Sequence, residues 1–222
     1  MGRHPDAAIV YGGFRMVDAD LRPIFRDEVR AIEGDPCLAF LRGNVIGVHG
    51  AATYRRDVVL QKGGFDERLR SSEDYDIYLK LARRLPIVSH DEIVVEYRKH
   101  GSNMTDNAPG MLATSLAVLD HKAQFALSYP GGAEAIAAGR RDWRPFYALR
   151  MLRSAAQVLK RRGPTADAGR LLPEAQSAGP ASIALGAAIW LSRQSSRMVR
   201  RRSGRAGLGA VAAAHPAAPE LR

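Results

Sequence analysis

The sequence has little cysteine and no long apolar run, and these shortages exclude several classes of protein. Cys37 is the single cysteine in 222 residues, so neither an internal disulfide nor a cysteine-based zinc cluster can form. This usage fits a reducing compartment. The most apolar stretch, residues 181–191, is Ala- and Gly-rich and falls short of the roughly 18 residues that a membrane span needs. The polar start, residues 1–6, is not expected to act as a secretory signal.

Acidic residues are scarce in the last third of the chain. Residues 139–222 hold 16 Lys and Arg against 4 Asp and Glu, whereas residues 1–138 hold 17 against 19. The formal charge of +10 therefore comes entirely from the C-terminal third. Such an excess favours contact with nucleic acid or an anionic membrane, but it says nothing about the first two-thirds. The hydrophobic share of 46% excludes a fully disordered chain.

Apolar patterning predicts strands and helices in the first two-thirds. Residues 7–18 begin as a buried strand, in which Gly12 and Gly13 allow a bulge or a close backbone approach. Asp18-Ala19-Asp20 is typical of a turn. Further strands are expected at 45–48, 51–54, 86–88 and 93–97, and helical segments at 55–60, 75–84, 111–128 and 143–161. The segment that begins at residue 36 is expected to be a short helix or a loop before the strand at 45–48.

The residues with the most chemical potential surround one predicted helix start. Ser71 and Ser72 are expected to cap it with their hydroxyls, and Glu73, Asp74 and Asp76 follow in its first turn. Neighbouring carboxylates raise each other's proton affinity, whereas a helix N-terminus favours the ionised form. Such a cluster suits general-base chemistry or a divalent cation. A capped helix with a solvated acidic first turn explains the same spacing, and the residues alone leave both interpretations open.

Four pieces of the sequence, in this order, resemble the C-terminal half of the catalytic domain of family 2 glycosyltransferases, which have the GT-A fold. They are residues 4–12, residues 44–56 ending in two arginines, GGFDE at 63–67 with EDYD at 73–76, and YRKH at 97–100 followed by Ser102. The resemblance covers about residues 5–105. It implies an α/β fold in which a mixed sheet has flanking helices.

The resemblance also implies a domain organisation. Residues 1–105 would be a partial GT-A domain, the acceptor-side half, and residues 106–162 a helical extension. Residues 163–222 would be a linker, a basic helix and a disordered, low-complexity tail. We expect the nucleotide-binding half of the family's domain, with its metal-binding Asp-x-Asp motif, to precede residue 1, so that the chain is a truncated transferase. Asp18-x-Asp20 imitates that motif, but its position in the family's pattern favours a turn.

The catalytic roles implied by the resemblance lie on Asp74 and Glu73. Asp74 corresponds to the family's catalytic base, which deprotonates an acceptor hydroxyl so that it attacks the anomeric carbon of a nucleotide sugar with inversion. Glu73 would shape the same pocket. The acceptor would be a glycan or a lipid-linked molecule in bacterial cell-surface polysaccharide or glycolipid synthesis. The implied location is the cytoplasm, including the inner face of the membrane.

Substrate and metal roles are implied for a second group of residues. Gly63 and Gly64 would let the backbone approach the sugar and the acceptor. Asp76 and Arg98 would bind substrate, Arg98 as a partner of the diphosphate. His100 is the candidate ligand for the Mn or Mg that the family uses, although the residues alone favour an ordinary loop histidine.

The basic C-terminal region has three interpretations. Arginines and lysines share residues 140–162 with aromatic and aliphatic side chains, which suits a helix lying on an anionic membrane. A solvated basic face in an Arg-rich sequence explains the same pattern. Nucleic-acid binding is disfavoured because no aromatic-interleaved or zinc motif accompanies the charge. The alternative to an enzyme is therefore a non-catalytic binding module whose basic tail contacts a partner, a membrane or nucleic acid.

Overall fold

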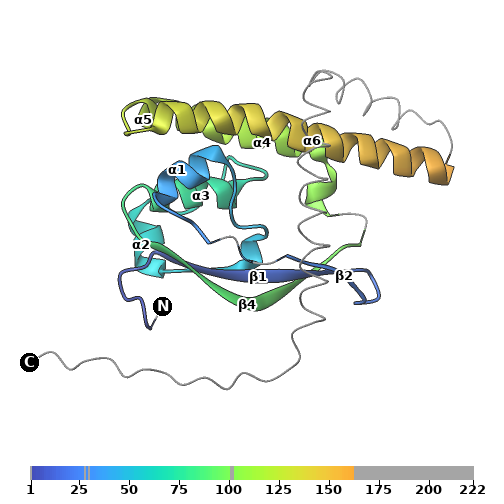
Figure 1. Cartoon of the computed structure of the whole chain (residues 1–222), viewed down its shortest axis with the longest axis horizontal. Coiled ribbons are helices and arrows are strands. Elements are labelled where there is room, and N and C mark those ends of the chain that lie inside the picture. The colour runs from blue at the N-terminus through green and yellow to red at the C-terminus, as the bar shows by residue number, and fades with distance from the viewer. Residues whose placement is uncertain (1, 28, 30, 101–102, 163–222) are drawn as a thin grey trace, which may run out of the picture.

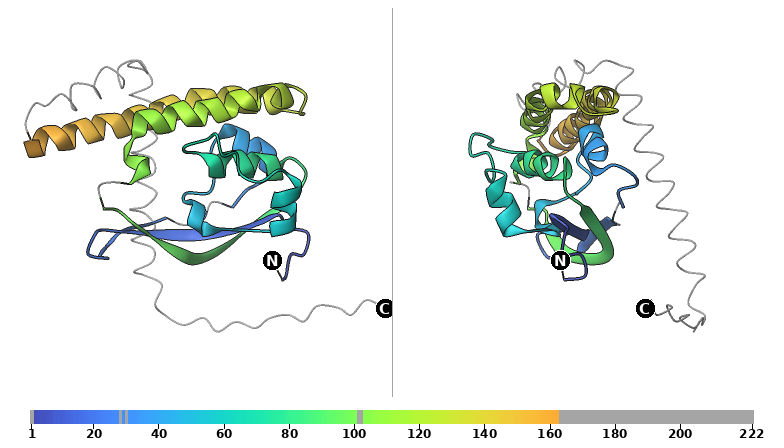
Figure 2. Two further views of the ribbon diagram at one scale, coloured as in Figure 1. Left: turned by 180° about the vertical axis from the view of Figure 1, so that it is seen from behind. Right: turned by 90° about the vertical axis from the view of Figure 1, so that its left-hand side faces the viewer.

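A computed structural model describes residues 2–27, 29, 31–100 and 103–162, and the predictions for residues 163–222 and for Ser102 lie outside these described residues. A four-stranded sheet forms one layer, and the described helices lie over one of its faces (Figure 1). Helices α1 (Pro36–Arg42) and α3 (Glu73–Ala82) lie nearest the sheet. Helices α4 (Ala108–His121), α5 (Ala123–Leu127) and α6 (Gly132–Arg162) lie beyond them, as the two further views also show (Figure 2).

The sheet is built around strand β1, Ile9–Val17. Strand β4, Ile87–Arg98, runs parallel along one edge of β1. The other edge pairs antiparallel with β3, Ala52–Tyr54, over the first half of β1 and with β2, Pro23–Asp27, over the second half. Parallel and antiparallel pairs therefore share one sheet, and the predicted α/β fold with a mixed sheet and flanking helices is confirmed.

Glycine in β1 permits a close approach of β4. A Cβ atom on Gly12 would lie 2.7 Å from the carbonyl oxygen of Glu92 and 2.7 Å from the ring of His90. The pairing register between β1 and β4 shifts beside this position. The predicted bulge or close approach is therefore confirmed, because a side chain here would push the two strands apart.

The predicted turn at Asp18-Ala19-Asp20 is also confirmed, and it begins a hairpin. The Asp18 carboxylate accepts the backbone N–H groups of Asp20 and Arg22, each at 2.9 Å. A side chain committed to its own turn in this way is typical of an Asx turn rather than of a metal ligand. The hairpin leads into β2, a strand that the sequence pattern did not indicate.

The helices follow the strands as compact segments with identifiable ends. Asp35 caps α1 by accepting the N–H groups of Cys37 and Leu38, and a proline in the first turn needs no such partner. The helical elements are α1 Pro36–Arg42, η1 His49–Ala51, α2 Arg56–Gln61, α3 Glu73–Ala82, η2 Met104–Asp106, α4 Ala108–His121, α5 Ala123–Leu127 and α6 Gly132–Arg162.

The core lies between the sheet and the helices and extends into α6. Its buried members come from strand β1 and from the helices, among them Ile9, Phe40, Ile77, Leu119 and Ile136. A smaller cluster joins α6 to the start of α4 through Tyr147, Met151 and Ala108. Within the described residues, no helix is both long enough and apolar enough to cross a membrane.

Several expected boundaries are wrong. Residues 45–48 form a loop with a bend at Ile46 and Gly47 instead of a strand, because the Asn44 side chain accepts the Ile46 N–H at 3.1 Å and turns the backbone. The strands expected at 86–88 and 93–97 are one strand, β4, since β1 pairs with both of its ends and the register shifts between them. The helix expected at 111–128 is divided at Lys122 into α4 and α5. Helix α6 begins eleven positions before the expected residue 143, at Gly132.

Candidate functional site

Hydroxyl groups anchor the N-terminus of α3, in a different way from the one expected. Ser72 is the N-cap residue, but its side chain makes no capping hydrogen bond and its backbone is left-handed, with φ at 61°. The Ser71 hydroxyl instead lies 2.7 Å from that of Thr114, and the Ser72 hydroxyl lies 3.2 Å from Thr114 and 3.4 Å from Ser115. The predicted side-chain cap is therefore wrong, because α4 engages both hydroxyls. This contact fixes where the following carboxylates lie.

Asp74 is a half-buried carboxylate in the first turn of α3. The backbone N–H of Tyr75 donates to its carboxylate at 2.7 Å. Burial raises the pKa of Asp74 above its ordinary value, the Tyr75 N–H opposes this rise, the charge of Glu73 adds to it, and His49 opposes it. A carboxylate with a raised pKa holds a proton more readily, which is the property that a general base needs.

An aromatic cluster lies beside this carboxylate. Tyr78 of α3 and Tyr54 of β3 are stacked with ring centroids 6.1 Å apart. The Tyr54 ring meets His49 at 5.7 Å and Phe65 at 5.9 Å, and the latter two lie 5.5 Å apart. Burial raises the pKa values of Tyr54 and Tyr78, and the charge of Asp74 raises them further. The cluster therefore extends from the core to the surface next to Asp74.

Asp76 lies in a different environment although it is two residues from Asp74. Its side chain is 3% exposed and pairs with Lys80 at 2.8 Å and with Lys122 at 2.5 Å. Lys80 also donates to the carbonyl oxygen of Gly64 at 3.2 Å. Because these contacts join α3 to the end of α4, they give Asp76 a role in holding the fold, and its predicted substrate-binding role stays a prediction.

Gly63 and Gly64 both have positive φ, 81° and 68°, as the predicted turn requires. Their N–H groups donate to the carbonyl oxygens of Leu60 and Val59, which satisfies the last turn of α2. A Cβ on either glycine would meet no atom within 4 Å. Glycine is thus required at these two positions for its backbone conformation. The predicted contact of Gly63 and Gly64 with substrate stays a prediction.

Arg98 and His100 lie at the carboxyl end of β4. The Arg98 guanidinium donates to the carbonyl oxygen of Ala19 at 2.5 Å, in the turn that follows β1. The His100 N–H donates to the Asn103 side chain at 3.0 Å, and the His100 ring lies 3.3 Å from the Asn103 amide nitrogen. These contacts connect the two residues to the loops at this end of the sheet.

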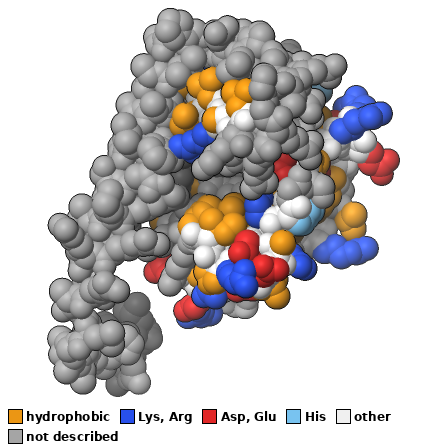
Figure 3. Space-filling model, turned by 90° about the vertical axis from the view of Figure 1, so that its right-hand side faces the viewer, with side chains coloured by type: hydrophobic (Ala, Val, Ile, Leu, Met, Phe, Trp, Pro, Cys, Tyr) orange, Lys and Arg blue, Asp and Glu red, His pale blue; other side chains and the backbone are white. Residues whose placement is uncertain are grey.

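The described residues do not fit a divalent metal. Across the described ranges, no three His, Cys, Asp or Glu side chains gather closely enough to hold an ion. His100 is therefore not joined there by a ligand set. On the side of the molecule in Figure 3, acidic side chains lie next to basic ones instead of forming a patch of one sign.

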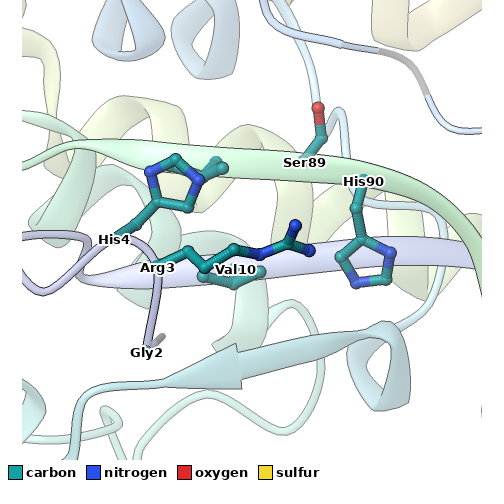
Figure 4. A pocket seen from close by; sticks show the side chains of 7 residues that line it. Gly2, Arg3, His4, Val10, Ser89 and His90 are labelled. Atoms are coloured by element: carbon teal, nitrogen blue, oxygen red, sulfur yellow. The ribbon is translucent and has the colours of Figure 1, made fainter. Parts of the chain in front are cut away.

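A pocket of about 550 Å³ lies elsewhere, on the first halves of β1 and β4. Its lining residues are Gly2, Arg3, His4, Val10, Val88, Ser89 and His90 (Figure 4). None of them is a predicted site residue. The carboxylates of α3 thus stand apart from this pocket.

The comparison with protein families tests the resemblance that the sequence motifs indicate. Residues 1–126, more than half of the chain, match the family described as glycosyltransferase-like family 2. The chain belongs to this family. No curated protein matches the chain. Membership in glycosyltransferase-like family 2 confirms the resemblance and supports glycosyltransferase activity in general, with a nucleotide sugar and an acceptor as partners. Family 2 glycosyltransferases generally use divalent metals.

Sequence reasoning did not select the aromatic neighbours of Asp74. His49, Tyr54 and Tyr78 belong to three separate elements and come together only in the fold. Phe65 carried a usable signal, since it is an aromatic residue inside the glycine turn at 63–67 and remains 38% exposed. An exposed aromatic ring in a polar turn is a reason to suspect binding.

Proposed function

We propose that this chain is an inverting glycosyltransferase in which Asp74 is the general base. The observation that carries the proposal is a half-buried carboxylate with a raised pKa, in the first turn of α3 of a family 2 chain. Proton transfer by a positioned side chain contributes about 10²- to 10⁴-fold to a rate.

The reaction needs one displacement. The Asp74 carboxylate accepts the proton of an acceptor hydroxyl, whose oxygen forms a bond to the anomeric carbon of the nucleotide sugar. The bond from that carbon to the diphosphate breaks on the opposite face, and the nucleoside diphosphate leaves with the electron pair. No covalent enzyme intermediate forms, and inversion follows. Glu73 borders the same space and raises the proton affinity of Asp74.

Leaving-group contacts belong to the proposal as well. Arg98 supplies a guanidinium that suits the fork geometry of a diphosphate. The described residues present no ligand set for the Mn or Mg of the family. We place the enzyme in the cytoplasm, in synthesis of a surface polysaccharide or glycolipid, with a glycan or lipid-linked acceptor.

The membrane interpretation of the basic helix gains no support from α6. Trp143, Phe146, Tyr147 and Met151 belong to the clusters that join α6 to the rest of the fold. The apolar side chains expected to enter a membrane are therefore engaged within the molecule.

The experiment compares Asp74→Asn with the wild-type chain, using a panel of nucleotide sugars and simple glycosides and measuring released nucleoside diphosphate. We expect the variant to lose about 10²-fold or more of the rate, because asparagine cannot accept the proton. Asp120→Asn is the matched control, since Asp120 is 64% exposed on α4 and pairs with Arg140. Equal rates for Asp74→Asn and wild type would overturn the assignment.

A further inference from the structure

We propose that Tyr147 of α6 is a positioning residue for Asp74, and that it acts through Ser115 of α4 and the serine pair at the start of α3. The inference rests on the proposed function, because it names what holds the base of that same site in place. It brings in a helix that lies beyond residues 1–126, the range of the family match. Helices α4 and α6 lie side by side beyond α3 (Figures 1 and 2).

The first link is a buried group of hydroxyls between α3 and α4. Ser71, Ser72 and Ser115 are 7%, 5% and 2% exposed. The Thr114 hydroxyl donates to the carbonyl oxygen of Gly110 at 3.0 Å, within α4. Because a hydroxyl carries one hydrogen, Thr114 is left to accept the hydroxyl hydrogens of Ser71 and Ser72. Both serines therefore hold the start of α3 against α4.

The second link joins α6 to this group. Tyr147 is 5% exposed, and a hydrogen bond joins its hydroxyl to Ser115. Burial raises the pKa of Tyr147, the bond to Ser115 and the charge of Arg150 lower it, and the charge of Asp74 raises it. The Ser115 hydroxyl also lies 3.4 Å from that of Ser72. A series of hydroxyls thus runs from α6 to the N-cap of α3, near enough to Asp74 for its charge to act on Tyr147.

The third link reaches the chain on the other side of the base. Trp143 stacks on the Tyr147 ring, one turn away on α6, with ring centroids 5.4 Å apart. The Trp143 ring also meets the Tyr75 ring edge to face at 5.8 Å. The Tyr75 hydroxyl donates to the carbonyl oxygen of Phe40 at 2.6 Å, and its backbone N–H donates to the Asp74 carboxylate. Helix α6 is therefore connected to α3 both before and after this carboxylate.

These links bear on the burial of Asp74. The first turn of a helix has N–H groups without partners inside the helix, and helix ends fray. Burial is the leading cause of the raised pKa of Asp74. A buried hydrogen-bond network in which each member is satisfied holds one geometry. Loss of a member of the network should therefore let water reach Asp74.

The closing experiment follows the ionisation of the Asp74 carboxyl by carbon-13 NMR in the full chain, with Asp74→Asn identifying the signal. Tyr147→Phe removes one hydroxyl and keeps the ring, and we expect the pKa of Asp74 to fall toward its ordinary value of 3.8. Thr114→Val removes the acceptor of both serine hydroxyls and should lower the pKa of Asp74 as well. Thr114→Ser keeps a hydroxyl and should retain the wild-type pKa.

Matched controls break a hydroxyl pair in another part of the fold. The Tyr97 and Thr105 hydroxyls lie 2.9 Å apart, between β4 and η2. Tyr97→Phe and Thr105→Val make the same two chemical changes there, and they should leave the pKa of Asp74 unchanged. The Tm of each variant shows whether it folds. Tyr147→Phe carries the test by itself if Thr114→Val does not fold.

Transfer gives a second readout where the wild-type chain is active. In Tyr147→Phe, kcat should fall about tenfold with little change in the acceptor KM, because the base is displaced while the acceptor contacts remain. The acidic limb of the pH–rate profile should move to lower pH, since a base of lower pKa ionises at lower pH. A merely structural role of Tyr147 would lower the Tm without moving this limb.

Failure of the inference and failure of the proposed function give different results. A lowered pKa of Asp74 in Tyr147→Phe and Thr114→Val, with no transfer by any chain, supports the positioning role although the proposed function fails. An unchanged pKa in Tyr147→Phe, or an equal fall in Tyr97→Phe, overturns the inference. A fall in Tyr147→Phe without one in Thr114→Val overturns the route through the serines. Transfer that is lost in Asp74→Asn and unchanged in Tyr147→Phe leaves the base in place and removes the positioning residue.

Discussion

At the scale of single residues, Asp74 and Asp76 show how two positions on a helix separate two identical side chains. Residues two apart on a helix point in different directions. Asp74 faces the aromatic cluster and has a raised pKa, whereas Asp76 meets two lysines within the fold. One carboxylate is therefore available for chemistry, and the other holds α3 against α4.

The raised pKa of Asp74 predicts that the ionised form of this side chain destabilises the folded chain. At pH values above 3.8, the ordinary pKa of this carboxyl, the unfolded chain loses the Asp74 proton more readily than the folded chain does. Stability contributed by the protonated form is therefore lost as the pH rises from that value through the raised pKa. We expect Asp74→Asn to be more stable than wild type at neutral pH, and equal to it in acid. Denaturant unfolding across this range tests the difference, and a variant less stable at neutral pH would contradict it.

Asp76 predicts the opposite stability effect. Replacing Asp76 by Ala leaves Lys80 and Lys122, 25% and 17% exposed, without the carboxylate between them. We expect the free energy of unfolding to fall by about 3 kcal/mol. Asp120→Ala removes an exposed ion pair and should cost under about 1 kcal/mol. Urea unfolding measures both losses. Similar losses for the two variants would show that the buried ion pairs of Asp76 stabilise the fold no more than an exposed ion pair does.

At the scale of elements, the start of α3 combines an unfavourable backbone conformation with contacts to α4. A left-handed backbone costs a non-glycine residue roughly 1–2 kcal/mol, and such conformations collect at functional sites. Ser72 accepts this conformation while its hydroxyl meets Thr114 and Ser115. The charges of Asp74 and Glu73 at this helix start raise the pKa values of Tyr54 and Tyr78 in the aromatic cluster.

Two substitutions at Ser72 separate backbone conformation from hydroxyl contact. Ser72→Gly and Ser72→Ala both remove the hydroxyl, but only glycine adopts a positive φ without cost. We therefore expect the glycine variant to be more stable than the alanine variant by about 1 kcal/mol. Thermal unfolding of both proteins is the measurement. An alanine variant as stable as the glycine variant would show that position 72 is not held left-handed.

At the scale of the whole molecule, α6 belongs to the same core as the family domain. The family match ends at residue 126, yet Ala135 and Ile136 of α6 are buried in the main core. Gly139 lets α6 approach α1, since a Cβ there would lie 2.1 Å from the carbonyl oxygen of Leu41. Helix α6 is thus packed so closely against α1 that the two backbones approach each other at Gly139.

Gly139→Ala tests this packing through the sign of its effect. In an exposed helix the change would stabilise by about 1 kcal/mol, because alanine is the better helix former. Here the Leu41 carbonyl must move, and we expect a loss of about 2 kcal/mol. Chemical unfolding measures the sign directly. A gain in stability would mean that α6 does not pack closely on α1.

The local features and the family of this chain could be predicted from its residues and their order. Gly12 in the first strand, the Asx turn at Asp18 and the positive φ of Gly63 follow from the conformations that these residues permit. The four ordered motifs indicated the family that the comparison confirms. These inferences depend on neighbours along the chain or on residue order, both of which a sequence contains.

The surroundings of each carboxylate depend on the tertiary structure. Whether Asp76 meets Lys122, and whether Ser72 caps α3 or contacts α4, depends on side chains brought from more than forty residues away. The aromatic neighbours of Asp74 are likewise spread over η1, β3, the turn at 63–67 and α3. Burial sets the pKa of a carboxylate, and burial is a property of the packed molecule, so no local pattern could separate Asp74 from Asp76.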